Sequence, residues 1–252
     1  MLSQAAFWPA VTAGIWLGGS NKEMKKGEIR KQEILKVAEE LFCKNGYEKT
    51  SIQNILDVLH SSKGSFYHHY ESKESLLEAM CIQRAGQIAQ KAAEESVKLT
   101  DPVKKLNCLM TGIFPLSEER LSFLLMLLPV FSTQEGKSVR NCYCDALASA
   151  FRGLIADQLE RCSEVGLTNY RDATVTASLC ILIINNLWCS ICDSLIGSSS
   201  DNEDLPDMSS TINQVRIAVE RMISAPYGSL ELIRLQDVTS LAGKIRSHWK
   251  TV

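Results

Sequence analysis

Residues 61–77, SSKGSFYHHYESKESLL, combine residue types that rarely occur together in so short a stretch. Lysine, serine and histidine are interspersed with three aromatic side chains, Phe66, Tyr67 and Tyr70. A helix in a protein core would leave many of these polar groups without hydrogen-bond partners, and disordered segments are typically poor in aromatic residues. The composition therefore indicates a polar surface that is held in place by a few aromatic anchors.

Two helices are predicted before this stretch. Residues 28–44 carry apolar residues at helical spacing, and Gly46 predicts the end of that helix because glycine readily takes the left-handed conformation of a helix cap. Thr50 is followed three residues later by Gln53, a capping-box pattern that predicts the start of a second helix. This second helix is expected to end near His60.

Two further helices are predicted within and after residues 61–77. Ser62 is expected to cap a short helix over residues 63–69, and Ser72 a longer helix that runs from Lys73 into the nineties. Three helices before a longer fourth, with about four residues joining the second and third, match a helix-turn-helix pattern. In such a motif the second helix of the pair, here residues 63–69, lies in the major groove of DNA.

The composition of residues 61–77 suits a DNA surface. Phosphates line the groove, so donors of hydrogen bonds are needed at its rims, and helix N-termini such as those at Thr50, Ser62 and Ser72 add backbone N–H groups. Gly64 would let the helix approach the DNA backbone closely, while Phe66 and Tyr70 anchor the helix inside. The expected side-chain donors are Lys63, Ser65, Tyr67, His68 and Lys73.

The run TSIQNILDVLHSSKGSFYHHYESKESLLEAM, residues 50–80, resembles the signature of the TetR family of bacterial transcriptional regulators. That signature has Thr at the start of helix two, S-K-G-x-x-Y-x-H/Y-F near the recognition helix, and S-K-E-x-L-L at the start of helix four. The matching residues are Thr50, Ser62-Lys63-Gly64, Tyr67, His68-His69-Tyr70 and Ser72-Lys73-Glu74-Ser75-Leu76-Leu77. The match covers about residues 28–80, and beyond it only the all-helical layout and the length agree.

Two positions depart from the family pattern. The family usually has Gly in the turn and then a small apolar residue, where this sequence has His60 and Ser61. His tolerates a positive φ better than most residues, so the turn is expected to survive at some cost. Both changes can shift the recognition helix, so the operator sequence does not follow by analogy.

The resemblance implies a symmetric homodimer that binds a palindromic double-stranded DNA operator. At the matching positions it implies phosphate contacts for Thr50, Tyr67, His68 and Lys73. It implies contacts with base edges for Lys63, Ser65 and His69. Core packing is the alternative for both tyrosines; we expect it for Tyr70 and not for Tyr67.

The rest of the chain also predicts helices, so the fold class is all-α, with an N-terminal three-helix helix-turn-helix domain and a larger C-terminal helical domain. The predicted spans are 102–113, 117–132, 137–165, 170–197, 207–224 and 228–248. Residues 24–75 are expected to form the DNA-binding domain, with the motif at about 50–70. Residues 76–252 are expected to bind a ligand and to dimerise.

Residues 1–23 are expected to be a disordered leader or a non-native start, because Met24 opens a segment that looks like a natural beginning. A partner-binding extension is the alternative. The apolar run is too short and interrupted to span a bilayer, and no basic region precedes it as in a secretory signal. No membrane partner is expected, and the chain is expected in the cytoplasm.

The charge balance and the residue types limit the classes of function that the chain can have. The net charge is −2, and residues 22–75 carry ten Lys and Arg against nine Asp and Glu, so a chain that binds nucleic acid must carry its positive charge on one local face. The nine cysteines are interpreted as small buried residues of a reducing cytosol. The pair Cys189 and Cys192 lacks a partner pair at metal-site spacing, and His68 and His69 point about 100° apart on a helix. We therefore expect no metal, no cofactor and no enzymatic activity, since no phosphate-binding loop or catalytic motif is present.

The C-terminal half offers coarser signals. Residues 170–197 are apolar on most sides, so they form a buried or a subunit-interface helix, and the family layout pairs this helix with residues 207–224 or 228–248 in a four-helix dimer bundle; an ordinary core helix is the alternative. The candidate pocket residues are large apolar side chains and one amide, each of which could also be plain core: Met110, Phe114, Phe123, Met126, Phe131, Tyr143, Leu147, Asn185 and Trp188.

The sequence thus predicts a DNA-binding repressor that is released from its operator by a small, mainly apolar effector. The resemblance implies that the effector acts through the helix that starts after Ser72. The alternative is a helical protein–protein adaptor that keeps the scaffold without reading DNA, which the near-neutral charge of residues 22–75 favours.

Overall fold

The computed structural model describes residues 26–116, 118–134, 136–197 and 208–249, and all regular elements in these ranges are α-helices, which confirms the predicted fold class. Residues 1–23, which the sequence predicts to be a leader, and residues 198–207 lie outside the described residues. The helices are α1 (Lys26–Asn45), α2 (Ile52–Val58), α3 (Lys63–Tyr67), α4 (Lys73–Val97), α5 (Pro102–Thr111), α6 (Glu118–Phe131), α7 (Gly136–Glu164), α8 (Ala173–Gly197), α9 (Ser209–Met222) and α10 (Leu235–Trp249).

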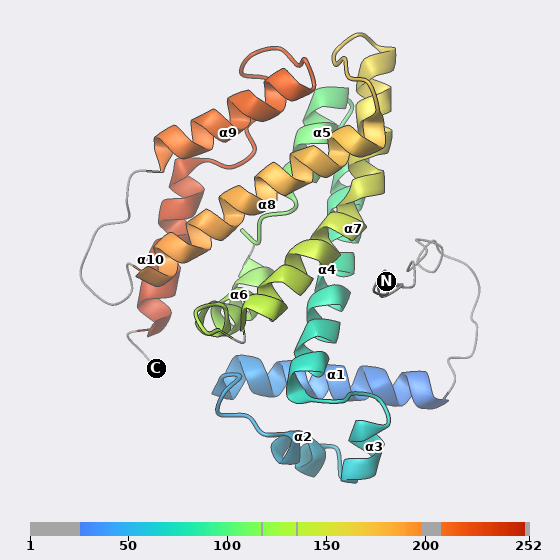
Figure 1. Cartoon of the computed structure of the whole chain (residues 1–252), viewed down its shortest axis with the longest axis vertical. Coiled ribbons are helices and arrows are strands. Elements are labelled where there is room, and N and C mark those ends of the chain that lie inside the picture. Colours follow the sequence, from blue (N-terminus) through green and yellow to red (C-terminus); the bar gives the residue numbers. More distant parts are fainter. Residues whose placement is uncertain (1–25, 117, 135, 198–207, 250–252) are drawn as a thin grey trace, which may run out of the picture.

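The helices form a small unit and a larger unit that share α4 (Figure 1). The helices α1, α2 and α3 lie together at one end of the molecule, and the first turns of α4 lie against them. From there α4 extends into the larger unit, where it packs along α7, and α7 packs in turn against α8. The small unit is therefore joined to the rest by the long helix α4, and α1 also contacts α6.

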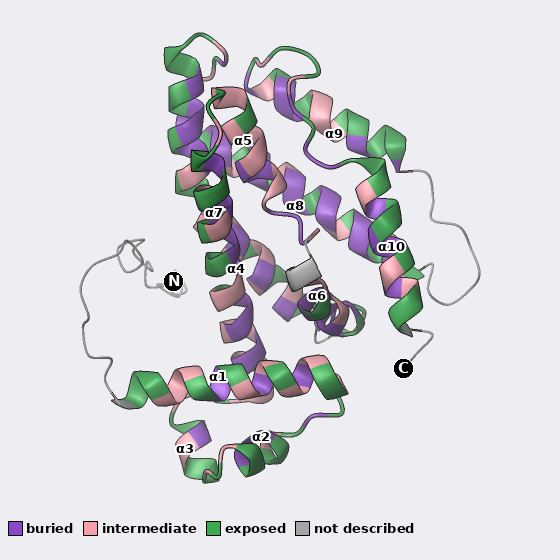
Figure 2. Ribbon diagram, turned by 180° about the vertical axis from the view of Figure 1, so that it is seen from behind, coloured by how far each residue is buried: buried purple, intermediate pink, exposed green. Residues whose placement is uncertain are grey.

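Each helix turns its apolar residues inward, and the buried positions run without a break through both units (Figure 2). The buried side chains of α1 include Ile34, Ala38 and Phe42, which are spaced by four residues, in agreement with the predicted helical spacing, and Leu35 is buried beside them. The ring of Phe42 meets Tyr47 edge to face at 5.1 Å, directly after Gly46 ends the helix with φ of +87°. The predicted stop at Gly46 is confirmed.

Helix α8 is the most apolar long helix of the described residues. By length and composition it could cross a membrane, and it is the one helix in the described ranges that could. However, 56% of its apolar window is buried inside the structure, as in the core helix of a folded domain. Twelve of its residues are buried, and the helix packs against α7 and α9.

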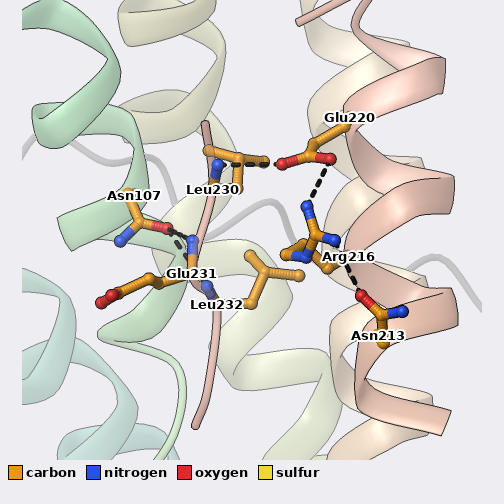
Figure 3. A network of polar contacts seen from close by, with 7 residues as sticks. All are labelled: Asn107, Asn213, Arg216, Glu220, Leu230, Glu231 and Leu232. Atoms are coloured by element: carbon orange, nitrogen blue, oxygen red, sulfur yellow. Dashed lines mark hydrogen bonds and ion pairs between the residues drawn. The ribbon is translucent and has the colours of Figure 1, made fainter. Parts of the chain in front are cut away.

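The last helix begins later than predicted. Residues 228–234 do not continue a helix, because Gly228 and Leu232 take positive φ of 77° and 47°, and α10 starts at Leu235. This segment passes between α5 and α9 as an extended strap (Figure 3). The prediction of a helix over 228–248 is therefore wrong at its N-terminal third, where tertiary contacts hold the chain extended.

Two distant side chains accept the backbone hydrogen bonds of the strap (Figure 3). The Asn107 side-chain oxygen on α5 accepts from the N–H groups of Glu231 and Leu232, at 2.9 and 3.2 Å. The Glu220 carboxylate on α9 is 2% exposed and accepts from the Leu230 N–H at 3.0 Å and from the Arg216 guanidinium at 2.8 Å. Since a buried carboxylate must be paired, these bonds fix the path of the strap.

We expect Glu220→Ala to lower the free energy of unfolding by about 2–3 kcal/mol, because it leaves a buried N–H and a guanidinium without their acceptor. Urea denaturation followed by circular dichroism measures this change. The matched control is Glu231→Ala, whose exposed side chain lies in the same strap and should change the stability by less than about 0.5 kcal/mol. Equal effects of the two substitutions would contradict the role given to Glu220.

The cysteines are all free thiols, and four of the nine are buried: Cys81, Cys162, Cys180 and Cys192. The prediction of buried cysteines is thus right for these four, and the other five are half-buried. Cys189 does not pair with Cys192 but lies 3.8 Å from the sulfur of Cys144 on α7. The hydrogen bond from the Cys144 thiol, aided by Arg140, lowers the pKa of Cys189 to about 7.

Candidate nucleic-acid interface and effector cleft

The start of α2 differs by one residue from the prediction. The capping residue is Ser51, whose hydroxyl accepts from the Asn54 N–H at 3.2 Å while the Asn54 side chain accepts from the Ser51 N–H at 2.8 Å. Thr50 is 1% exposed, and its hydroxyl donates to the Gly46 carbonyl at 2.8 Å. The capping role predicted for Thr50 is therefore wrong, and its side chain does not lie on the outer surface.

The turn between α2 and α3 follows the prediction closely. His60 takes a positive φ of 47°, the conformation expected for the position where the TetR family usually has glycine. Ser62 caps α3 by accepting from the Ser65 N–H at 3.3 Å. Helix α3 ends at Tyr67 rather than at residue 69, since the backbone turns after His68 towards the start of α4.

We expect His60→Gly to raise the free energy of unfolding by about 0.5–1 kcal/mol. Glycine removes the strain of the left-handed conformation from the folded state, and this gain exceeds the stabilisation of the unfolded chain by the added entropy of glycine. Thermal unfolding followed by circular dichroism checks the sign. His68→Gly is the control, since His68 has a φ of −69° and should lose stability on the same change. A loss of stability in His60→Gly would contradict this account of the turn.

The aromatic residues of α3 divide into anchors and surface. Phe66 is fully buried, and Tyr70 is 4% exposed and donates its hydroxyl to the Lys31 carbonyl at 3.3 Å. Tyr67 is 54% exposed and touches the Phe66 ring only edge to face, at 5.4 Å. Tyr70 therefore lies in the core, as predicted, and Tyr67 presents its hydroxyl to solvent.

Most of the other predicted contacts share this exposed face. Ser62, Lys63, Gly64 and His68 are exposed and Ser65 is half-buried. The two remaining candidates turn away from it. His69 lies near Gly27 at the start of α1, and the Lys73 ammonium donates to the Tyr47 carbonyl at 3.1 Å and sits 4.1 Å from the Tyr47 ring centre.

The sequence reasoning missed the exposed residues at the start of α2. Ser51, Gln53 and Asn54 are exposed beside the turn, so they extend the polar face formed by α3. The pattern Ser51-x-x-Asn54 is itself a capping signal and could have indicated them. Together the two helices present hydroxyl, amide, ammonium and imidazole groups, which are the donors that a phosphate-lined groove requires.

A second candidate site is a cleft of about 150 Å³ between α4, α6 and α7. Of the nine predicted pocket residues, only Phe123 and Tyr143 line it, and their rings meet edge to face at 6.1 Å. The other seven predicted residues do not line this cleft and are buried in the core: Met110, Phe114, Met126, Phe131, Leu147, Asn185 and Trp188. The six apolar side chains serve packing, as in the 6.0 Å ring contact of Phe114 with Trp188, and the Asn185 amide donates to the Cys144 carbonyl at 3.2 Å.

The sequence reasoning missed the polar side of the cleft. Arg84, Gln87 and Lys91 line it from α4, and Arg120 from α6. Arg84 forms an ion pair with Glu39 of α1, and its guanidinium lies 5.5 Å from the Phe123 ring centre. Arg120 donates to the Gly112 carbonyl at 2.9 Å. Residues 84, 87, 88 and 91 have helical spacing, which could have shown that they share one face of α4.

Comparison with known proteins agrees with the exposed helix pair. Residues 34–80 match the family model of bacterial regulatory proteins of the tetR family. The transcriptional repressor AcnR of Corynebacterium diphtheriae is 32% identical over 78 residues, which are 31% of this chain and 40% of AcnR. The transcriptional regulator QacR of Staphylococcus aureus is 46% identical over 56 residues, which are 22% of this chain and 30% of QacR. The chain thus spans less than half the length of these relatives.

Three further similarities extend over most of the chain, one in sequence and two in fold. The uncharacterized regulator YuxN of Bacillus subtilis is 25% identical over 84% of this chain and 70% of its own length. The crystal structure of RolR in complex with resorcinol superposes with a TM-score of 0.53 at 13% identity, covering 87% of this chain and 95% of RolR. A Mesorhizobium loti protein described as a TetR-family regulator gives a TM-score of 0.51 at 14% identity, over 88% and 98% of the two chains. The named relatives are transcriptional regulators and not enzymes, in agreement with the sequence prediction.

Proposed function

We propose that this chain, a DNA-binding transcriptional regulator of the TetR family, acts as a homodimeric repressor that leaves a palindromic operator when a small effector binds. Residues 24–75 would form the DNA-binding domain and residues 76–252 the effector-binding and dimerisation domain. Such a regulator would act in the cytoplasm, where its operator DNA lies. The observation that carries the proposal is the exposed polar face of α2 and α3, which coincides with the segment that matches the family model.

The face suits contact with phosphate at its rims and with bases at its centre. Tyr67, His68 and Ser51 lie exposed around α3 and would donate to phosphates, while Lys63 and Ser65 on α3 would reach base edges. Thr50 is buried, Lys73 donates to the Tyr47 carbonyl and His69 lies near Gly27, so the three would support this face rather than touch DNA. These proposed roles differ from the contacts that the resemblance implies for the three residues.

We expect Tyr67→Ala to weaken operator binding at least about tenfold, because a hydrogen bond to a charged phosphate is lost in each half-site. Fluorescence anisotropy against DNA fragments upstream of the gene measures this at about 50 and about 200 mM salt, and the affinity of the unchanged protein should fall steeply between them. Tyr227→Ala is the control, since Tyr227 is 76% exposed, lies just before the strap with its ring beside Arg216 of α9, and should leave binding unchanged.

The adaptor alternative makes the opposite prediction for the same titration. A scaffold that does not read DNA would bind all fragments weakly, and Tyr67→Ala and Tyr227→Ala would behave alike. Such a result, obtained with a folded protein at low salt, would overturn the proposed regulator function.

An apolar stripe on α8 supports the homodimer. Val175, Leu179 and Leu182 are spaced by four and three residues, and they are 56, 45 and 65% exposed although α8 is otherwise the most buried long helix. Isolated chains rarely expose apolar side chains in a row, and a twofold axis would let the stripe pack against its own copy. This placement matches the interface that the resemblance implies for α8.

We expect Leu182→Glu to convert the dimer to a monomer, because two carboxylates would be buried against an apolar partner surface. Sedimentation equilibrium measures the mass, and thermal unfolding should show a chain that remains folded since the side chain is exposed in the single chain. Val97→Glu, at a 76% exposed site on α4, is the control and should leave the mass unchanged. A monomeric mass for the protein without substitutions would contradict the proposed homodimer.

The cleft between α4, α6 and α7 supports control by an effector. It lies against α4, the helix that joins the two units. The structure of RolR, which shares the fold, was determined in complex with resorcinol, a small molecule. A ligand that prefers one of two arrangements of α4 would change operator affinity about 5- to 150-fold for a coupling of about 1–3 kcal/mol.

A further inference from the structure

We propose that the cleft between α4, α6 and α7 binds a small amphipathic carboxylate, whose anion pairs with Arg84 in competition with Glu39 of α1. The inference rests on the proposed function, because it names the chemical class of the effector that the regulator would sense. It also replaces the mainly apolar effector that the sequence predicts. The observations that carry it are the charges of the cleft lining and the contacts of Arg84.

The charges that line the cleft all have one sign. Arg84, Lys91 and Arg120 line it, and no Asp or Glu is among the described lining residues. The rest of the lining is largely apolar and includes Ile88 of α4 and Phe123 and Leu127 of α6. A cleft that combines cationic and apolar side chains matches a ligand with one anionic group and an apolar body.

The volume sets the size of that body. A cavity of about 150 Å³ lined by apolar side chains is large enough for benzene, as measured for an engineered cavity in another protein. The ring of Phe123 beside the cleft can stack on an aromatic ligand. A single aromatic ring or a short aliphatic chain therefore fits, with its carboxylate at the cationic side.

The contacts of Arg84 leave room for one more acceptor. Its Nη2 donates to the Glu39 carboxylate and its Nη1 to the Gln87 side chain at 3.3 Å, while its Nε is buried and has no hydrogen-bond partner among the described residues. Guanidinium groups bind carboxylates best in a bidentate manner, through two parallel N–H groups. A ligand carboxylate that takes the Nε and Nη2 pair would satisfy the buried Nε and would displace Glu39.

The competition for Arg84 would couple the cleft to the DNA-binding unit. Glu39 lies on α1, and Arg84 lies on α4 at the boundary between the two units, so their ion pair links the two helices. Both side chains are largely buried, with 33 and 20% exposure, so the pair is shielded from solvent more than a surface ion pair. A carboxylate that occupies Arg84 would remove this ion pair between α1 and α4 and would in this way lower operator affinity.

Isothermal titration calorimetry of the free protein tests the ligand class. Benzoate and hexanoate are titrated beside their primary amides, which have the same shape and no charge. We expect each acid to bind at least about tenfold more tightly than its amide, because the amide loses the charge-assisted hydrogen bonds. Equal affinities of acid and amide, or no binding of either acid, would overturn the proposal.

Two variants test the competition. Glu39→Gln should tighten acid binding several-fold and leave amide binding unchanged, because the internal competitor for Arg84 has lost its charge. Arg84→Gln should abolish the preference for the acids, whereas Arg140→Gln should keep it, since Arg140 pairs with Asp193 away from the cleft. An unchanged acid affinity in Glu39→Gln would overturn the competition even where Arg84→Gln fails to fold.

Operator release separates the two proposals. Anisotropy with labelled operator should show that benzoate or hexanoate releases the DNA and that the amides do not. Protein that binds the operator but ignores both acids would refute the effector class and leave the regulator function standing. Protein that binds the acids but no DNA sequence would refute the regulator function, because the calorimetry does not depend on DNA.

Discussion

The continuity of α4 is the constraint on which the rest of the structure depends. Its 25 residues form one unbroken helix of about 37 Å. Ser72 and Ser75 close a capping box at its start, with hydrogen bonds of 3.0 and 3.1 Å. Its first turns bury Leu76 and Leu77 in the small unit, and its later turns pack along α7 in the larger unit. A change in the position of α4 in one unit is therefore felt in the other, since both pack on the same rigid element.

The small unit depends on a few local interactions for its shape. Caps at Ser51 and Ser62 hold two helices of seven and five residues, which are too short to be stable without tertiary contacts. Phe66 and Tyr70 supply those contacts, and the left-handed residue His60 sets the angle between the helices. Because the anchors Phe66 and Tyr70 face inward, the outer face is free to carry polar groups. A unit with a balance of only one positive charge can in this way concentrate hydrogen-bond donors on the side that would meet DNA.

Local chemistry made the small unit predictable from sequence. The caps at Ser62 and Ser72, the stop at Gly46, the positive φ of His60 and the buried Tyr70 all depend on neighbours within a few residues. The identity of the capping residue was ambiguous at the start of α2, since Thr50 and Ser51 are adjacent and both can cap a helix. The position of the Lys73 side chain was harder to predict, because its partner Tyr47 lies 26 residues away in the sequence.

Long-range contacts explain what the sequence could not supply. The strap before α10 is extended because Asn107 and Glu220, from two other helices, accept its backbone hydrogen bonds. The cleft could not be predicted from the sequence, because Arg84 and Lys91 have the pattern of a solvated helix face and only the tertiary structure places α6 and α7 beside them. Large apolar residues such as Met110 and Trp188 have the chemistry of pocket walls, but only the tertiary structure shows that they fill the core.

The most direct test of the account is a selection of DNA from a random-sequence pool by the purified full chain, followed by sequencing of the bound molecules. The account predicts the enrichment of one sequence with twofold symmetry, whose half-sites are read by the α3 helices of two subunits. It further predicts that the Tyr67→Ala protein enriches this sequence poorly or not at all. A pool that stays random with folded, dimeric protein, or that yields a single unsymmetrical site, would contradict the claim that this chain reads DNA as a symmetric regulator.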